Sequence, residues 1–98
     1  MKLGRVTGTV VATRKSPKLV GTKLLLVEEC DVEGKPKGTF VVAADTVGAG
    51  VGETVLLVAG SSARLAYPQE GTPIDAAISG VIDAVEYNGK VTHPNRLS

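Results

Sequence analysis

Few residues of this chain have the types and spacing that catalysis requires. His93 is the only histidine and Cys30 the only cysteine. A Ser-His-Asp or Cys-His arrangement would depend on His93, which precedes Pro94 in an expected C-terminal tail. Cys30 has acidic neighbours whose charge disfavours a thiolate, so we interpret it as a small apolar side chain. These neighbours are Glu28, Glu29 and Asp31.

Carboxylates and metal ligands give no stronger indication of chemistry. Asp45, Asp75 and Asp83 are acids that acid–base catalysis would use, but two of them occupy expected loop or helix-start positions, where Asp is common as a turn or capping residue. Cys, His and carboxylates nowhere show metal-ligand spacing. The sequence therefore predicts no catalytic residue, no cofactor site and no metal site, and indicates a protein that is not an enzyme.

A glycine-dense loop, residues 45–53, is the most distinctive stretch of the chain. Gly48, Gly50 and Gly52 alternate with other residues, which resembles a phosphate-binding loop. A dinucleotide fingerprint places its third glycine one position later, where this chain has Glu53, and requires a helix afterwards, whereas a strand is expected here. No Gly-Lys-Ser/Thr triplet ends the run either. We therefore expect the glycines to allow close backbone contact within or between subunits.

Composition limits the size and the partners of the protein. The chain has 98 residues, of which 21% are charged and 43% hydrophobic. One small domain cannot bury so much apolar surface, which indicates oligomerisation. A net charge of +1 provides no long-range field for nucleic acid or anionic lipid. No apolar run approaches the ~20 residues of a membrane span, and the first residues do not resemble a signal peptide, so we expect a cytosolic, soluble protein.

Apolar runs and turn residues predict a β-rich chain. Gly8 interrupts the first strand, where a bend or bulge is expected, and Asn88-Gly89 is a strong hairpin signal. Short helical turns are predicted at residues 61–65 and 72–75, and residues 14–18 form a basic, solvated loop. The expected strands are Arg5–Thr13, Leu24–Cys30, Thr39–Ala44, Thr54–Ala59 and Ile78–Glu86.

These elements predict an all-β fold: a small five-stranded antiparallel OB-like β-barrel with one or two short helical turns. We expect a single domain over residues 1–98, with a core over about 1–86 and a terminal hairpin and tail over 87–98. OB barrels commonly bind oligonucleotides on aromatic platforms, but aromatic residues are 3% of this chain. Phe40 lies in a strand expected to be buried, and Tyr67 and Tyr87 border turns. A binding module for an oligonucleotide or a small anionic ligand remains the alternative function.

Several motifs together resemble the EutN/CcmL family of bacterial microcompartment vertex proteins. They run in the family's order from the first strand to about residue 86, and differences are expected at residues 67–72 and after residue 86. The motifs are Val6-Thr7-Gly8-Thr9-Val10-Val11, Lys23-Leu24-Leu25, Asp45-x-Val47-Gly48-Ala49-Gly50-x-Gly52-Glu53, Gly60-Ser61-Ser62-Ala63-Arg64 and Pro73-Ile74-Asp75-Ala76.

The resemblance implies a homopentamer that caps the vertices of a polyhedral protein shell around metabolic enzymes. Its partners would be further copies of itself and the hexameric and trimeric shell proteins, with no nucleic acid and no membrane, and its location the shell of a microcompartment in the cytoplasm. We expect the ring interface to use the glycine-dense loop and the turn that follows the next strand. The predicted interface residues are Asp45, Val47, Gly48, Ala49, Gly50, Gly52, Glu53, Ser61, Ser62 and Arg64.

Overall fold

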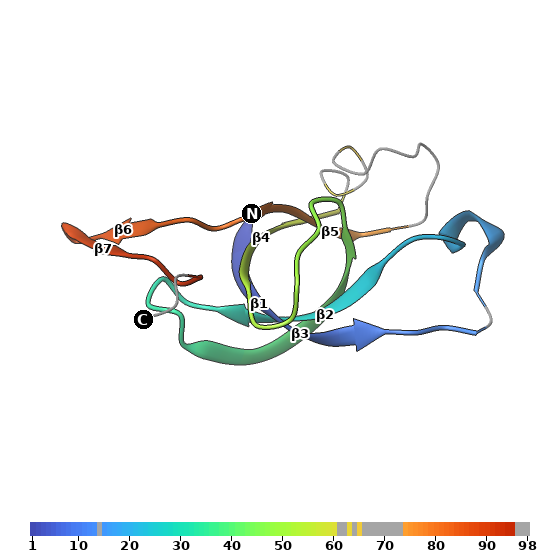
Figure 1. Ribbon diagram of the computed structural model, residues 1–98, viewed down its shortest axis with the longest axis horizontal. Helices are drawn as coiled ribbons and strands as arrows, with labels where there is room; N and C mark the ends of the chain where they lie inside the picture. The colour runs from blue at the N-terminus through green and yellow to red at the C-terminus, as the bar shows by residue number, and fades with distance from the viewer. Residues whose placement is uncertain (14, 61–62, 64, 66–73, 96–98) are drawn as a thin grey trace.

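The computed structural model describes residues 1–13, 15–60, 63, 65 and 74–95. Within this part of the chain, seven strands and one short 3-10 helix are present (Figure 1). The elements are β1 Lys2–Val10, η1 Pro17–Leu19, β2 Leu24–Cys30, β3 Pro36–Asp45, β4 Thr54–Ala59, β5 Ala76–Val81, β6 Val85–Tyr87 and β7 Lys90–Thr92.

Five strands close into a barrel in the order β1-β2-β3-β5-β4, which confirms the all-β barrel. The expectation that every pair is antiparallel is wrong, because β3 and β5 run parallel, with Ala44 opposite Ala77 and Asp45 opposite Ile78. The reason is geometric: strand directions cannot alternate all the way round a closed ring of five. At least one neighbouring pair must be parallel, and in this chain it is β3 with β5.

The first strand carries two glycines with different roles. The pairing of β1 with β2 shifts register between Val6 and Gly8, which confirms the predicted irregularity at Gly8. Gly4, for which no close contact was predicted, is the tighter position, because a Cβ there would lie 2.6 Å from Val27 Cγ1 and 2.9 Å from Leu57 Cδ1. The strand also begins and ends about three residues earlier than expected, at Lys2–Val10.

The apolar core has two parts. The larger cluster fills the barrel from all five strands and from the loop after β3. The smaller lies between the outer side of the barrel and Ala63, a fully buried residue with helical backbone. The larger cluster comprises Val6, Leu25, Val27, Ala43, Ala49, Val55, Leu57, Ala76 and Ile78, and the smaller one Ala44, Val58, Ala63, Ile74 and Ala77.

Phe40 does not join the core as expected. Its side chain is 56% exposed, and that of Val42, two residues further along β3, is 43% exposed. Residues at alternate positions of a strand share a face, and here the inward face carries Val41 and Ala43. A continuous apolar run does not show by itself which of its two faces points inward.

The strand expected over residues 78–86 is divided. β5 ends at Val81, and a separate hairpin, β6 and β7, begins at Val85. Its turn is confirmed at Asn88 (φ 52°) and Gly89 (φ 76°), the left-handed pair of a type I′ turn. Figure 1 shows the hairpin projecting from one end of the barrel and the β1–β2 connection projecting from the other, and the molecule measures 46 × 23 × 22 Å.

The chain after β7 is anchored rather than free at Asn95. Its Oδ1 accepts a hydrogen bond from the Thr54 N–H (2.6 Å), and its Nδ2 donates to the carbonyls of Thr54 (2.9 Å) and Ile82 (2.8 Å). Within the expected tail, Asn95 is therefore held against the barrel. Residues 96–98 lie outside the described part of the chain.

The two predicted helical turns fall largely outside the described residues. Ala63 and Leu65 have helical backbone, whereas residues 61, 62 and 64 are not described, nor are residues 72 and 73 of the second turn. Within the expected basic loop, η1 is a helical turn that was not predicted; Ser16 Oγ caps it by accepting from the Lys18 N–H (3.3 Å). Among the described residues, no helix has the length and apolarity that a membrane span needs.

Candidate subunit interface

The glycine-dense loop is held in shape by Asp45, the last residue of β3. One carboxylate oxygen, Oδ1, accepts from the backbone N–H groups of Val47 (3.0 Å) and Gly48 (3.2 Å). This Asx-type turn reverses the chain directly after the strand. The Asp45 side chain is 2% exposed, so its charge requires partners.

Lys23 supplies the opposite charge from the residue just before β2. Its Nζ lies 3.2 Å from Asp45 Oδ2 and donates to the Ala49 carbonyl at 3.0 Å. Burial by itself raises the pKa of the Asp45 carboxyl, but the backbone N–H groups of the loop and the Lys23 ammonium together outweigh it and hold the pKa below its usual range. The ammonium therefore joins both halves of the loop through one side chain.

The second half of the loop closes on Glu53. The Gly50 N–H donates to Glu53 Oε1 (2.6 Å), and the Glu53 N–H donates to the Gly50 carbonyl (3.1 Å). The loop then rejoins the barrel: the Gly52 N–H donates to the Val6 carbonyl (2.8 Å), and the Val6 N–H donates to the Glu53 carbonyl (2.9 Å). Residues 45–53 are therefore a surface with a fixed backbone.

The three glycines of the loop differ in backbone conformation and in the space around them. Gly48 (φ 78°) and Gly52 (φ 93°) adopt left-handed backbone that favours glycine. Gly50 does not, and a Cβ there would meet only Glu53 Oε1, at 3.4 Å. The subunit alone therefore gives no steric reason for glycine at this exposed position.

The structure brings most predicted interface residues into this one loop. Val47 is 43% exposed and Val51, which was not predicted, is 64% exposed. Ala49 differs, because its side chain is 1% exposed and belongs to the barrel core, which leaves only its backbone for a subunit contact. Lys23 was not predicted as a functional residue; its position beside Leu24 in the family motif was the available signal. Ser61, Ser62 and Arg64 lie outside the described residues.

The residues first considered for catalysis do not assemble. Cys30 is 7% exposed, and its burial raises the pKa of its thiol. The negative charges of Asp31 and Glu28 also raise this pKa, whereas the positive charges of Arg5 and Lys37 lower it. His93 Nδ1 lies 3.1 Å from the Asp83 carbonyl oxygen. Asp45, Asp75 and Asp83 stand apart along the fold: at the end of β3, before β5 and after β5. Among the described residues, no three His, Cys, Asp or Glu side chains are grouped for a metal ion.

Comparison with known proteins relates this geometry to a family. The family model described as "Ethanolamine utilisation protein EutN/carboxysome" matches residues 1–83. The bacterial microcompartment shell vertex protein EutN of Salmonella typhimurium is 50% identical over 91 residues, which cover 93% of this chain and 92% of that protein.

Solved structures agree with the sequence match. The structure of Gloeobacter violaceus CcmL has a TM-score of 0.90 and 43% identity, and the match covers 97% of this chain and 98% of that chain. The GrpN pentameric microcompartment shell protein of Rhodospirillum rubrum has a TM-score of 0.80 and 48% identity over 89% of this chain and 98% of that chain. The family model spans most of the chain and the solved structures share its fold, so this chain is a member of the EutN/CcmL family.

Proposed function

We propose that this chain forms a homopentamer that caps the vertices of a polyhedral bacterial microcompartment in the cytoplasm. Its role is structural, not enzymatic. The observation that carries the proposal is the similarity, over nearly the whole chain, to proteins named as microcompartment shell vertex proteins, one of which is a pentameric shell protein.

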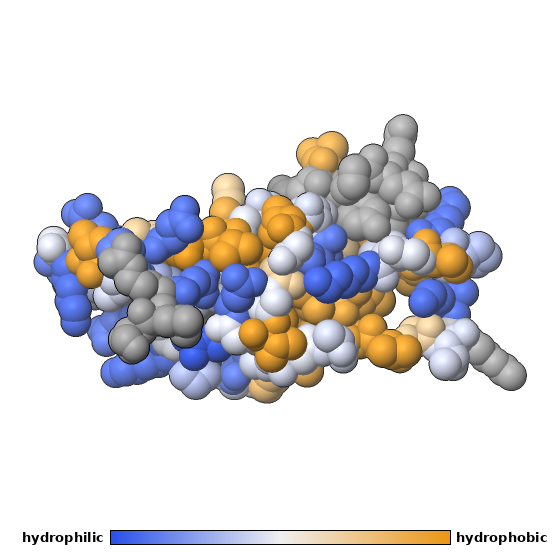
Figure 2. All heavy atoms as spheres, in the orientation of Figure 1, coloured by the Kyte–Doolittle hydropathy of each residue, from blue (hydrophilic) through white to orange (hydrophobic). Residues whose placement is uncertain are grey.

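The surface of the isolated subunit supports self-association. Large apolar side chains remain exposed at the hairpin end, over the barrel and on the β1–β2 connection, and Figure 2 shows apolar side chains spread along the visible face. Covering such surface against another copy is favourable by about 25 cal/mol per Å² of apolar area. The exposed side chains include Val11 (86%), Val20 (67%), Phe40 (56%), Val51 (64%), Tyr87 (48%) and Val91 (53%).

Ring geometry explains why a pentamer suits a shell vertex. The barrel presents different surfaces on its opposite sides, so copies pair head to tail, and such heterologous contacts close into a ring. A layer tiled by hexagonal units closes into a polyhedron only where pentagonal units replace some of them. The chain would therefore meet hexameric and trimeric shell proteins at its outer edge.

We assign the ring contact to the loop over residues 45–53 and to Ser61, Ser62 and Arg64, which lie outside the described residues. The fixed backbone of the loop, its exposed Val47 and Val51, and the unexplained glycine at position 50 support this assignment. A preformed surface loses little conformational entropy on association, which favours a stable ring.

Native mass spectrometry and light scattering on the purified protein test the ring. We expect a species of five times the 10.0 kDa subunit mass at micromolar concentration, and a stable monomer or dimer would contradict the proposal. Co-expression with hexameric and trimeric shell proteins tests the vertex role. Electron microscopy should show closed shells with this chain and elongated or open shells without it. Closed shells without any vertex protein would refute that role.

A further inference from the structure

The terminal hairpin, β6 and β7, has little support from the barrel. Among the described residues its two strands pair only with each other, and the hairpin projects from one end of the barrel (Figure 1). A cavity of about 160 Å³ separates its base from the barrel, and a groove of about 380 Å³ separates its tip from the turn after β2. A two-stranded hairpin by itself is only marginally stable in water, so this one calls for a further contact.

The base of the hairpin is nevertheless held in one position. Asn95 Oδ1 accepts from the Thr54 N–H at 2.6 Å, and its Nδ2 donates to the Ile82 carbonyl at 2.8 Å, so the chain leaving the hairpin is bonded to the chain entering it. His93 Nδ1 lies 3.1 Å from the Asp83 carbonyl oxygen and joins the same two segments. The hairpin is therefore a preformed arm, which loses little conformational entropy when it docks.

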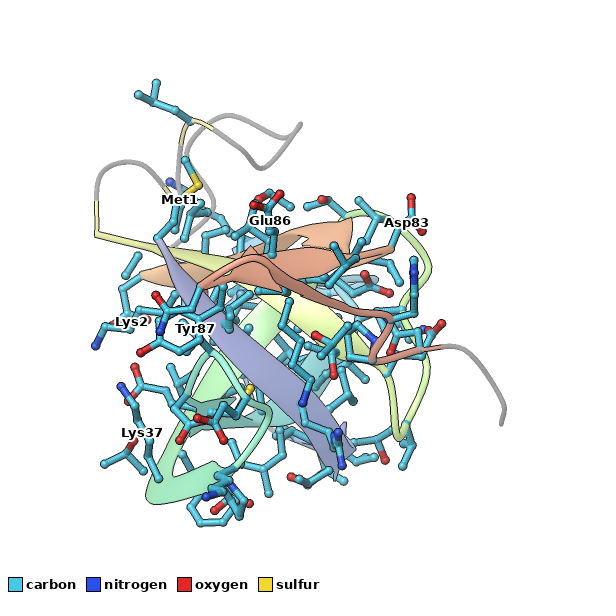
Figure 3. All side chains as sticks on the ribbon, turned by 90° about the vertical axis from the view of Figure 1, so that its left-hand side faces the viewer. Met1, Lys2, Lys37, Asp83, Glu86 and Tyr87 are labelled. Atoms are coloured by element: carbon cyan, nitrogen blue, oxygen red, sulfur yellow. The ribbon has the colours of Figure 1, made fainter. Side chains whose placement is uncertain are left out.

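One face of this arm is acidic and apolar. Glu86 and Val91 are paired across the two strands, so their side chains share a face, whereas Lys90 points to the opposite face. Val91 is 53% exposed. Glu86 and Asp83, which lies just before β6, are exposed, and neither forms an ion pair with a described residue. Figure 3 shows Glu86 and Asp83 along one edge of this end of the molecule.

The connection between β1 and β2, residues 11–23, has a complementary surface. Every charged side chain that the structure describes in this connection is a lysine. Lys23 is engaged by the glycine-dense loop, whereas Lys15 is exposed and forms no ion pair with a described residue. Val11 is 86% exposed and Val20 67%. The connection is therefore basic and apolar where the hairpin face is acidic and apolar.

The two surfaces lie at opposite ends of a molecule 46 Å long, so they cannot meet within one subunit (Figure 1). A contact between them needs a second copy, and it is head to tail, the kind of contact that closes into a ring. We propose that the hairpin face of each subunit docks on the β1–β2 connection of the next, with Glu86 and Asp83 facing Lys15 and with Val91 packing on the exposed valines of the connection. This inference rests on the proposed homopentamer and adds a contact to the one assigned to the glycine-dense loop.

A charge-reversal cycle tests the contact, with native mass spectrometry and light scattering of the full-length protein on dilution at low ionic strength. Glu86→Lys should raise the concentration at which half of the ring dissociates by roughly threefold to tenfold, because it brings like charges together. Lys15→Glu should have the same effect. The double variant should return most of the way to the wild type, since the pair is restored with its charges exchanged. Added salt should reduce the effect of each single variant, because it screens exposed charges.

Lys37→Glu is the matched control. Lys37 is exposed at the hairpin end but belongs to neither surface. Its reversal should leave dissociation of the ring unchanged, and it should not restore the ring when combined with Glu86→Lys. A thermal melt of each variant verifies that the barrel remains folded, as expected for substitutions of exposed side chains.

Cysteine cross-linking provides a second measurement of the same contact. In a Cys30→Ser background, which removes the native thiol, Val91→Cys and Val20→Cys together should give a covalent ladder up to the pentamer under mild oxidation. Either new cysteine alone should give no species larger than a dimer, because a head-to-tail contact brings the two different positions together.

A wild-type ring that neither charge reversal weakens would overturn this contact and leave the homopentamer standing. A double variant no more stable than its single parents, or the absence of the covalent ladder, would overturn it in the same way. A wild-type protein that is a monomer at micromolar concentration would instead overturn the homopentamer itself, and this contact with it.

Discussion

The ammonium of Lys23 lies 3.2 Å from the carboxylate of Asp45, and it also donates to the carbonyl of Ala49. One side chain from just before β2 thereby helps to fix the shape of the loop that follows β3. The carboxylate is almost fully buried, whereas the lysine side chain is 54% exposed. Removing the lysine therefore leaves a buried charge without its counter-ion.

Replacing Lys23 with Met should lower the free energy of unfolding by about 1–2 kcal/mol. The value lies below that of a fully buried pair because the ammonium is half in solvent and the loop N–H groups still bind Asp45. Urea denaturation at pH 7 measures it. Lys18→Met is the matched control, since the Lys18 side chain is exposed and forms no ion pair with a described residue. Equal losses in both variants would show that the ion pair contributes nothing.

Acid should weaken the loop through Asp45. The pKa of this carboxyl is lower in the folded protein than in the unfolded chain, so its stabilisation is fully present above the unfolded value of about 3.9 and is lost as the pH falls through the folded value. Asp45→Asn should therefore cost most stability at pH 6–7, and its difference from the wild type should shrink below about pH 4. Urea denaturation between pH 3 and pH 7 at one protein concentration measures this difference.

Some acid sensitivity should remain in the Asp45→Asn variant. The pKa of Glu29 is lowered, chiefly by the Lys2 side chain, and that of Asp31 is lowered, chiefly by the Lys35 backbone N–H. A difference between wild type and variant that stays constant from pH 7 to pH 3 would contradict the role given to the Asp45 charge.

Replacing Gly50 with Val should weaken the pentamer more than the barrel. Gly50 has no left-handed backbone, and a Cβ there has only Glu53 Oε1 nearby, so the subunit should change by less than about 0.5 kcal/mol. Gly48→Ala is the contrasting variant, because at φ 78° it should destabilise the subunit itself by about 1–2 kcal/mol. Native mass spectrometry with a thermal melt separates the two effects. An intact oligomer with unchanged stability in Gly50→Val would remove this loop from the proposed ring contact.

Replacing Gly4 with Ala should destabilise the barrel by about 1–3 kcal/mol through overpacking. The new methyl would lie 2.6 Å from Val27 Cγ1 and 3.2 Å from the Glu28 carbonyl oxygen, which belongs to the backbone and cannot easily move. Gly8→Ala on the same strand is the control, because its methyl would lie 4.0 Å from the nearest atom, Leu26 Cβ. Chemical denaturation compares the two variants, and similar values for both would refute the steric argument.

Local chemistry explains which sequence predictions succeeded. β2 and β4 have the expected bounds, because each is a compact apolar run between turn residues. The hairpin turn at Asn88-Gly89 and the irregular strand pairing at Gly8 were predictable, because each depends on glycine or asparagine within a stretch of two or three residues. The assignment of the glycine-dense loop to a subunit contact stays a prediction.

The sequence by itself determined the apolar runs, most of the turns and the family motifs of this protein. The tertiary structure decided which segments meet, including the parallel pairing of β3 with β5, the outward face of Phe40, the Lys23–Asp45 pair and the anchoring of Asn95 on Thr54. The physical reason is the distance along the chain over which each kind of interaction acts. Turn chemistry and side-chain alternation act over a few neighbouring residues, whereas ring closure joins segments far apart in the chain and fixes strand direction, exposed face and contact partners only when all five strands are in place.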